Sequence, residues 1–155
     1  MKNNAEARAS LLDRLVDDEP EAATEMRPLR VLTREELMAS VRQELVRLLN
    51  TRLDPARMDP SRTRTVLEYG VADYTAFHPA NQENRRRLAY MIETSIATFE
   101  PRLRNVRVHV DAPSRPHALA ARIEATLVAG SVHEPISFPM VIRHRDALIE
   151  VHADE

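Results

Sequence analysis

The 155-residue chain is long enough for one domain with a hydrophobic core and too short for two comfortable ones. Two glycines, no tryptophan and no cysteine leave few residues for phosphate-binding loops or base stacking and none for disulfides or thiolate metal sites. The net charge of -2 gives no overall attraction to nucleic acid, and no apolar run approaches the roughly 20 residues of a membrane span. We therefore expect a cytoplasmic protein that has no cofactor and does not insert into a membrane.

The N-terminal segment is polar except for one apolar island at residues 10–16. Ser10 can cap about two turns of helix there, and four apolar side chains share one side of it: Leu11, Leu12, Leu15 and Val16. A helix this short is marginal in water, so the segment packs on its own domain, docks on another subunit or stays disordered. The acidic connector that follows, up to Pro28, favours docking. We predict a flexible N-terminal tail over residues 1–32, with a short docking helix at about 10–16.

The first long helix is predicted to begin after Thr33. The hydroxyl of Thr33 can accept from the next turn while Glu36 reaches back, which is the capping-box pattern. Apolar residues then recur at the spacing of a core-facing stripe: Leu37, Val41, Leu45, Leu48 and Leu49. Asp54 followed by Pro55 predicts that this helix ends near residues 50–52.

Two further helical segments follow. A short turn is predicted over residues 62–68, with Val66 and Leu67 facing inward and Gly70 just past its end. The second long helix is predicted over residues 81–98. Its buried stripe consists of Leu88, Ile92, Ile96 and Phe99.

The C-terminal part is predicted to be a sheet, because Pro101 cannot continue the second helix. Alternating apolar and polar residues indicate strands at residues 106–110, 121–129, 136–142 and 148–151. Pro139 lies inside the third of these runs, which predicts an edge strand or a bulge. The order of elements predicts an α+β fold in which two long helices pack on a three- to four-stranded antiparallel sheet. Residues 33–155 are expected to form this single domain.

Catalytic and metal-binding patterns are weak in this sequence. A glycosidase needs two carboxyl groups, one of them with a raised pKa, and Glu100 is the candidate acid. Its second group, Asp73 or Asp111, can be named only by guesswork, and the nearby Arg102 would lower the pKa of Glu100. The six histidines are scattered without metal-ligand spacing. We predict no enzymatic activity and no metal site.

Three consecutive arginines, Arg85–Arg87, lie early in the second long helix. Nucleic-acid binders usually place aromatic side chains among such basic residues, and this run has none. The arginines are therefore predicted to form a solvated or partner-facing surface.

The charged residues on either side of Pro101 are the remaining candidates for a functional site. Proline fixes its own backbone angle, so Glu100 and Arg102 leave the junction in a defined relative direction. They can tie the helix end to the first strand inside the domain, or they can be presented together to a second protein. The sequence leaves both interpretations open.

Four motifs in one order resemble a known family. They are Ser10–Leu15, Ser40–Arg42 with Leu48–Arg52, Val66–Val71 and Phe99–Leu103. The family is TssE, the type VI secretion baseplate subunit that is related to the lysozyme-named wedge protein of contractile phage tails. The resemblance extends from about Ser10 to the C-terminus.

The resemblance implies a structural subunit of the type VI secretion baseplate wedge, with the partner subunits TssF, TssG and TssK. It also implies a part in starting polymerisation of the contractile sheath, by addition of a sheath strand at residues 136–142 or 148–151. The alternative function is a peptidoglycan-cleaving, lysozyme-like hydrolase, which these residues do not favour.

Two groups of partner-binding residues follow from the resemblance. The first is the family's hallmark motif: Glu100, Pro101 and Arg102. The second is the N-terminal docking helix: Leu11, Leu12, Asp13, Arg14 and Leu15. On this reading, Arg102→Ala is expected to abolish assembly while the fold stays intact.

Overall fold

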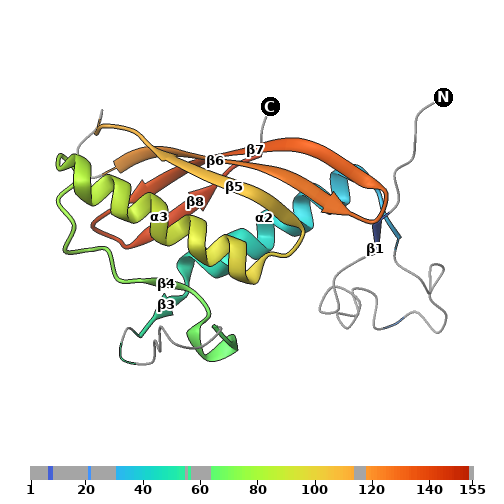
Figure 1. Cartoon of the computed structure of the whole chain (residues 1–155), viewed down its shortest axis with the longest axis horizontal. Helices are drawn as coiled ribbons and strands as arrows, with labels where there is room; N and C mark the ends of the chain where they lie inside the picture. The colour runs from blue at the N-terminus through green and yellow to red at the C-terminus, as the bar shows by residue number, and fades with distance from the viewer. Residues whose placement is uncertain are drawn as a thin grey trace.

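The computed structural model describes residues 7–8, 21, 31–54, 56, 64–113 and 118–153. Two helices, α2 (Arg34–Asn50) and α3 (Gln82–Phe99), lie against one face of a four-stranded antiparallel sheet (Figure 1). The strands follow one another in space as β5 (Leu103–Val110), β6 (Ala118–Ala129), β7 (Val132–Arg143) and β8 (Leu148–Val151). The predicted α+β arrangement is confirmed for these elements, and the sheet has four strands.

Helix α2 begins and ends where the sequence predicts. The hydroxyl of Thr33 accepts from the backbone N–H of Glu36 at 3.3 Å, and the Glu36 carboxylate accepts from the N–H of Thr33 at 2.7 Å. These two bonds satisfy donors that a helix start otherwise leaves without partners. All five residues of the predicted apolar stripe are buried, and Ser40 is buried beside them.

Helix α3 is capped by Asn81, whose side-chain oxygen accepts from the N–H groups of Glu83 and Asn84. Leu88, Ile92 and Ile96 are buried as predicted, whereas Phe99 is half-buried. The helix ends at Glu100, directly before Pro101, as the proline predicts.

Four short strands, in two pairs, lie outside the main sheet. Strand β1 (Ala7–Arg8) pairs antiparallel with β2 (Val31–Leu32), and β3 (Arg52–Leu53) pairs parallel with β4 (Val71–Ala72). The pairing of β1 was not predicted in a segment expected to be a flexible tail. The predicted docking helix at residues 10–16 lies outside the described residues.

The turn η2 (Val66–Glu68) differs from its prediction. Val66 and Leu67 were expected to face inward, but their exposed fractions are 82% and 65%, whereas Glu68 is only 4% exposed. Apolar character alone predicted the wrong side. The turn instead places its carboxylate inward, where the backbone N–H and the hydroxyl of Thr65 both donate to it at 2.6 Å.

The sheet is a meander with one irregularity. Strands β6 and β7 pair along their full length and are joined by the two residues Gly130 and Ser131, with Gly130 at φ +59. Strand β5 contains a β-bulge between Arg104 and Arg107, where Asn105 adopts φ +54. Asn tolerates this left-handed conformation better than most residues, and a bulge increases the local twist of a strand.

Strand β7 is not an edge strand at Pro139, contrary to the prediction. It pairs with β6 on one side and, over Met140–Arg143, with β8 on the other. The backbone oxygen of Pro139 accepts from the N–H of His152 at 2.8 Å, so Pro139 turns its backbone toward β8 and away from β6. Because Pro139 has no N–H, it could not donate to β6 or β8, but this removes no bond from the β6–β7 ladder. Pro139 lies at the position where the pairing with β8 ends.

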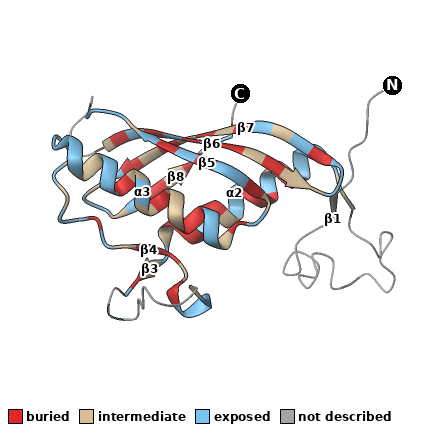
Figure 2. Ribbon diagram, viewed as in Figure 1, coloured by how far each residue is buried: buried red, intermediate tan, exposed pale blue. Residues whose placement is uncertain are grey.

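The core lies between the two helices and the sheet (Figure 2). Strands β5 to β8 turn alternate side chains toward the helices, and these are buried almost without exception. Among the largest fully buried side chains are Tyr74, Phe138, Ile92 and Leu45. The helices thus cover one face of the sheet, while the residues that alternate with the buried ones turn to the other, exposed face.

Candidate functional site

The Glu100-Pro101-Arg102 junction forms a closed ion pair. The Nε of Arg102 donates to Oε1 of Glu100 at 2.8 Å and its Nη2 donates to Oε2 at 2.7 Å, which is a bidentate geometry. The backbone N–H of Arg102 also donates to Oε1 at 3.2 Å. Glu100 is 4% exposed, whereas Pro101 is exposed.

This pair connects three elements. The Nη1 of Arg102 donates to the hydroxyl of Ser40 on α2 at 2.9 Å, and the backbone oxygen of Arg102 accepts from Val128 of β6 at 2.7 Å. Both charged side chains are thus used within the chain, as one of the two sequence interpretations proposed. Because Arg102 neutralises a buried carboxylate, we now expect its removal to affect folding, which replaces the expectation of an intact fold.

The Val66–Val71 motif forms a second internal cluster. The Nη2 of Arg64 donates to the backbone oxygens of Glu68 at 2.7 Å and of Gly70 at 3.2 Å, and the Ser95 hydroxyl of α3 donates to the same Gly70 oxygen at 2.6 Å. Burial lowers the pKa of Arg64, and the charge of Glu68 partly opposes this shift. The cluster fixes the loop to α3.

Gly70 is required at this position for two reasons. Its φ is +116, and an added Cβ would lie 2.4 Å from the backbone oxygen of Thr51. That close approach allows the N–H of Val71 to donate to the same Thr51 oxygen at 3.0 Å. The glycine thus lets β4 pair with the chain that leaves α2.

The Leu48–Arg52 motif, at the C-terminal end of α2, binds the strand β8 and the turn before it. The Nδ2 of Asn50 donates to the backbone oxygen of Ile149 at 2.8 Å, and Oδ1 of Asn50 accepts from the N–H of Ile149 at 2.8 Å. Arg52 donates to the backbone oxygens of Leu49 and Ala147 and to the hydroxyl of Tyr74. The pKa of Tyr74 is raised, chiefly by burial. These contacts attach β8 and the turn before it to α2.

Side chains occupy backbone hydrogen-bonding groups on the outer sides of both end strands, β8 and β5. The two bonds from Asn50 replace a neighbouring strand at Ile149 on the outer side of β8. On the outer side of β5, the N–H of Val108 donates to Oε1 of Glu93 at 2.8 Å, and α3 runs along this strand. An incoming strand would have to displace these side chains.

A third edge is left open. Strand β8 pairs only with Met140–Arg143, and within the described part of the chain no strand pairs with Val132–Phe138 on that side. The backbone alternation that turns Pro139 toward β8 also turns His133, Pro135 and Ser137 toward this open side. Pro135 has no N–H, so the open edge offers N–H donors at His133 and Ser137 only.

A groove of about 370 Å³ runs between α2 and the open edge of β7, and we call it the α2–β7 groove. Its lining residues are Arg34, Glu35, Met38, Ala39, Arg42, Pro135–Phe138 and Ala153. The N-terminus of α2 is held to β7 by the ion pair between Arg34 and Glu134 at 2.7 Å. The groove lies where a longer β8 would continue.

The residues considered for catalysis and metal binding are not gathered into such a site. Glu100 is enclosed by its ion pair, while Asp73 accepts from its neighbour Thr75 and Asp111 is exposed at the end of β5. Among the described residues, no group of three or more His, Asp or Glu side chains converges as metal ligands would.

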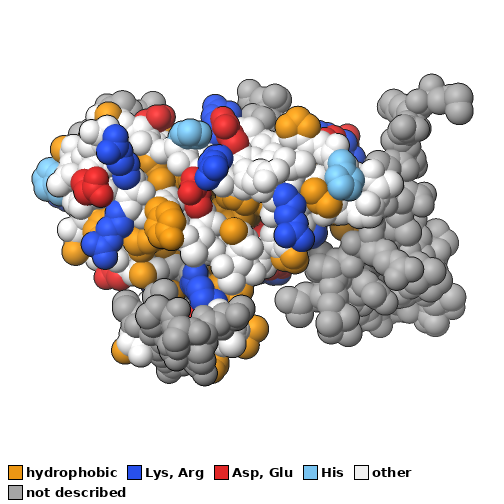
Figure 3. All heavy atoms as spheres, in the orientation of Figure 1, with side chains coloured by type: hydrophobic (Ala, Val, Ile, Leu, Met, Phe, Trp, Pro, Cys, Tyr) orange, Lys and Arg blue, Asp and Glu red, His pale blue; other side chains and the backbone are white. Residues whose placement is uncertain are grey.

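The three arginines of α3 are separated in the structure. Arg85 donates to the backbone oxygens of Pro79 and Ala80 at 2.9 Å, and the guanidinium of Arg87 lies over the Phe77 ring at 5.3 Å from its centre. On the face shown in Figure 3, basic and acidic side chains are interspersed rather than gathered by charge. Neither described helix combines the length and apolar character that crossing a bilayer requires.

Sequence reasoning missed the roles of Asn50 and Glu93, and it named residues 136–142 as a possible strand-accepting edge without locating the open part at Val132–Phe138. Asn50 and Glu93 act on backbone groups far along the chain, and no local spacing marks them. The prolines of β7 were a usable signal, because Pro135 and Pro139 lie four residues apart and so turn their backbones to the same side. The N-terminal candidates, Leu11 to Leu15, lie outside the described residues.

Comparison with known proteins gives a consistent picture. A search of curated proteins finds no match. Among solved structures, three chains match. One of them comes from a structure entitled "The baseplate complex from the type VI secretion system". It is 19% identical in sequence, the match has a TM-score of 0.50, and it covers 69% of this chain and 94% of that chain. At this identity the likeness concerns the fold. The family model described as "Baseplate wedge protein gp25" matches residues 35–131, which is more than half of the chain, so this chain belongs to the gp25 family of baseplate wedge proteins.

Proposed function

We propose that this chain is a structural subunit of a type VI secretion baseplate wedge and that the open edge of β7 receives a strand from the first sheath subunits. Membership of the wedge family supports the structural role. The observation that carries the proposal is the contrast within one sheet: β5 is closed by a side chain at Val108 and β8 at Ile149, while β7 is open over Val132–Phe138 beside a groove. Exposed edges are normally protected in a protein that acts alone.

The groove suits an extended segment. A guest strand that continues β8 would run antiparallel to β7 and accept an N–H from Ser137. Its inward side chains would contact Met38, Ile136 and Phe138, which line the groove. Apolar contacts would then supply affinity, and the few backbone donors would set the register of the guest.

The contacts with other wedge subunits are assigned to two places. Residues 1–32 form a tail whose helix, at about 10–16, docks on TssF, TssG or TssK, and residues 33–155 form the wedge domain. At the family motif, Pro101 is the exposed residue and so offers the surface, while Glu100 and Arg102 hold it in place. The assembly works on the cytoplasmic side of the secretion system.

The hydrolase alternative gains no support from the geometry. A general acid must reach its substrate, and the carboxylate of Glu100 is enclosed and paired with Arg102 at 2.7 Å. We therefore assign no catalytic residue.

The strand-addition proposal is tested by two substitutions at one position. Ser137→Pro removes one of the two backbone donors of the open edge, the one beside the end of β8, while the β6–β7 ladder is kept because residue 137 turns its N–H away from β6. Ser137→Ala is the matched control, since both variants lose the 3.0 Å bond from Arg122 to the Ser137 hydroxyl. In a sheath-polymerisation assay seeded with purified wedges, we expect Ser137→Ala to act as wild type and Ser137→Pro to seed poorly. Equal seeding by the two variants contradicts the proposal.

The wedge contacts are tested by co-expression with TssF, TssG and TssK, followed by size-exclusion chromatography. Deletion through Val16 is expected to remove this chain from the complex, whereas Ser137→Pro is expected to co-elute like wild type. If the deletion variant stays in the complex, the tail is not the contact. If wild type elutes alone, the wedge assignment itself is wrong.

A further inference from the structure

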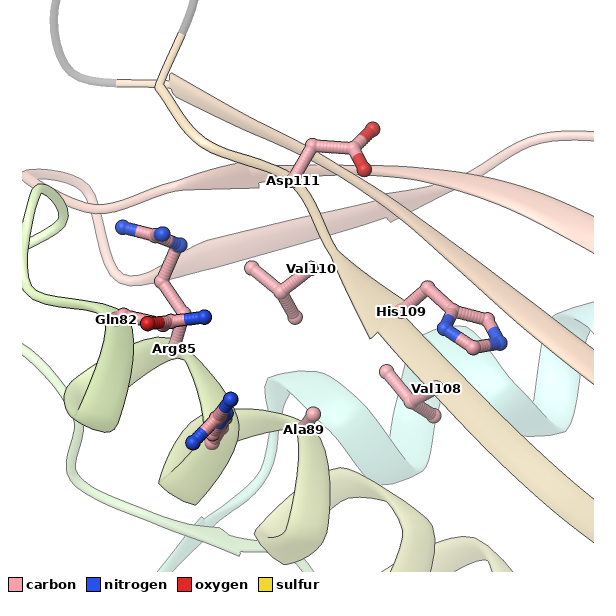
Figure 4. A pocket seen from close by; sticks show the side chains of 8 residues that line it. Gln82, Arg85, Ala89, Val108, His109, Val110 and Asp111 are labelled. Carbon is pink, nitrogen blue, oxygen red and sulfur yellow. The ribbon is translucent and has the colours of Figure 1, made fainter.

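A second groove lies on the same, helix-covered face of the sheet but at its opposite edge, between the first half of α3 and the C-terminal end of β5 (Figure 4). It encloses about 290 Å³. We call it the α3–β5 groove. Its floor is apolar, formed by Ala89 of α3 and by Val108 and Val110 of β5.

The charged side chains are sorted by strand alternation. Val108 and Val110 turn toward α3, so their neighbours His109 and Asp111 turn to the other face of the sheet. His109 accordingly lies 3.7 Å from Glu124 of β6, and Figure 4 shows the Asp111 carboxylate pointing away from Arg85. His109 and Asp111 belong to the lining of the groove, but because their side chains turn to the other face, the charged groups on the α3 side are the guanidinium groups of Arg85 and Arg86.

Arg85 is held in place, while Arg86 is exposed. Arg85 donates through Nη1 to Pro79 and Ala80, which fixes its position at the start of α3. Arg86, one residue on, is fully on the surface and lines the groove. The N-terminal end of a helix carries partial positive charge that adds to these two cations. This end of the groove therefore attracts a negatively charged group.

The backbone of β5 supplies the other half of the site. Asp111 donates its N–H to Ala120 of β6, so the residue before it, Val110, turns its N–H and C=O outward into the groove. Two residues earlier in β5, the N–H of Val108 donates to the carboxylate of Glu93, so this N–H is not available to a guest. Between Glu93 and the arginines, a short extended backbone can pair with Val110.

We propose that the α3–β5 groove binds a short extended segment of another protein that carries carboxylate side chains. The guest pairs its backbone with Val110, rests on the apolar floor and directs a carboxylate to Arg86 and Arg85. A peptide fits these features better than nucleic acid does, because the outward groups include a carbonyl as well as an N–H, and because Glu93 repels a second anion at the far end. The proposal is independent of strand addition at β7.

The probe is a fluorescently labelled hexapeptide in which Val and Glu occupy successive positions on one side of the extended chain and Ser fills the other side, and its partner probe replaces each Glu by Gln. Binding to the full chain is followed by anisotropy, and the contacted amides are located by ¹H–¹⁵N NMR. We expect shifts at Val108–Asp111 and Gln82–Ala89 with the Glu peptide, and binding at least about tenfold weaker for the Gln peptide. A Glu peptide that is N-methylated at alternate backbone positions is expected to bind weakly too.

Two neighbouring charge reversals form the matched control. Arg86→Glu places a carboxylate in the groove and is expected to weaken binding of the Glu peptide by about tenfold or more. Arg87→Glu changes the net charge equally, but Arg87 stacks on Phe77 outside the groove, and its effect is expected to stay within about twofold. Thermal melts confirm that both variants fold.

Several outcomes would overturn the proposal. Equal loss in Arg86→Glu and Arg87→Glu means that only overall charge acts. Equal binding of the Glu and Gln peptides would show that the groove does not recognise a carboxylate. If neither peptide binds, the groove is not a peptide-binding site. A duplex DNA probe that competes for the same amides with the same dependence on Arg86 identifies a general anion site instead.

Discussion

The Glu100–Arg102 junction and the open edge of β7 handle polar groups in opposite ways. At the junction, every charged group meets a partner inside the chain: Glu100 with Arg102, and Arg102 with Ser40. At the open edge, the backbone groups of alternate residues, His133, Pro135 and Ser137, face away from β6 and meet no strand within the described part of the chain. The same chain thus closes one polar region completely and leaves another for a partner.

The difference separates folding from assembly. Buried polar groups must be paired because an unpaired one costs stability, so the junction serves the fold. Exposed backbone groups are paired by water in the free protein and can exchange water for a partner strand, so the edge serves assembly. Substitutions in the two regions should therefore differ in what they change, and the following predictions test this.

The largest effect is expected at Arg102. Arg102→Ala leaves the enclosed Glu100 carboxylate without its cation and should lower the free energy of unfolding by about 3–5 kcal/mol, measured by urea denaturation. A double variant, Glu100→Leu with Arg102→Met, removes both charges and should be more stable than Arg102→Ala alone. If Arg102→Ala unfolds at the wild-type urea concentration, the junction belongs with the assembly surfaces.

Asn50 should come next, because it closes the edge of β8. Asn50→Ala leaves the N–H and C=O of Ile149 without their partners and should lower the free energy of unfolding by about 1–3 kcal/mol. Asn50→Asp keeps the acceptor and loses the donor, so it should fall between wild type and Asn50→Ala. Faster hydrogen exchange at the Ile149 amide would identify the edge as the cause, and unchanged exchange would contradict it.

Glu93 closes the β5 edge through one bond and should matter less. Glu93→Ala is expected to lower the free energy of unfolding by about 1 kcal/mol, since only the N–H of Val108 loses its partner. Glu93→Gln retains an acceptor oxygen and is the matched control, expected to stay near wild type. Equal losses in the two variants would point to the charge of Glu93 rather than to edge closure.

The smallest change in stability is expected at Pro135, on the open edge. Pro135→Val should alter the free energy of unfolding by less than about 0.5 kcal/mol, because Pro135 makes no ladder bond that valine would restore. It adds an N–H donor to the open edge and should promote pairing between copies, seen as self-association by sedimentation velocity. Pro113→Val, in an exposed loop, is the control. A monomeric Pro135→Val at high concentration would show that proline does not protect this edge.

Local signals predicted the elements well, and long-range contacts decided the rest. The Thr33–Glu36 capping box, the stop at Pro101 and the strand alternation are all written in neighbouring residues, and the structure confirms them. The inward side of η2 was predicted wrongly, because Glu68 is buried by contacts that apolar periodicity does not register.

The candidate site was predictable only in outline. The sequence marked Glu100 and Arg102 and left open whether they pair with each other, and their bidentate contact becomes visible only when α3, β5 and Ser40 are placed together. The open edge of β7 follows from the short length of β8 opposite a much longer β7. Pro139 indicated an edge or a bulge in this strand, and only the pairing of β7 with β8 locates the open part at Val132–Phe138.

The contact between Asn50 and Ile149 also bears on how the chain folds. The two residues are 99 positions apart, and Arg52 and Ala147 are 95 apart, so α2 reaches its place only after nearly the whole domain has been synthesised. Loop-closure entropy makes such distant contacts slow to form. During synthesis on the ribosome, the apolar side of α2 therefore stays without its contacts to β8 until β8 has been made, and the domain completes its folding in a late step.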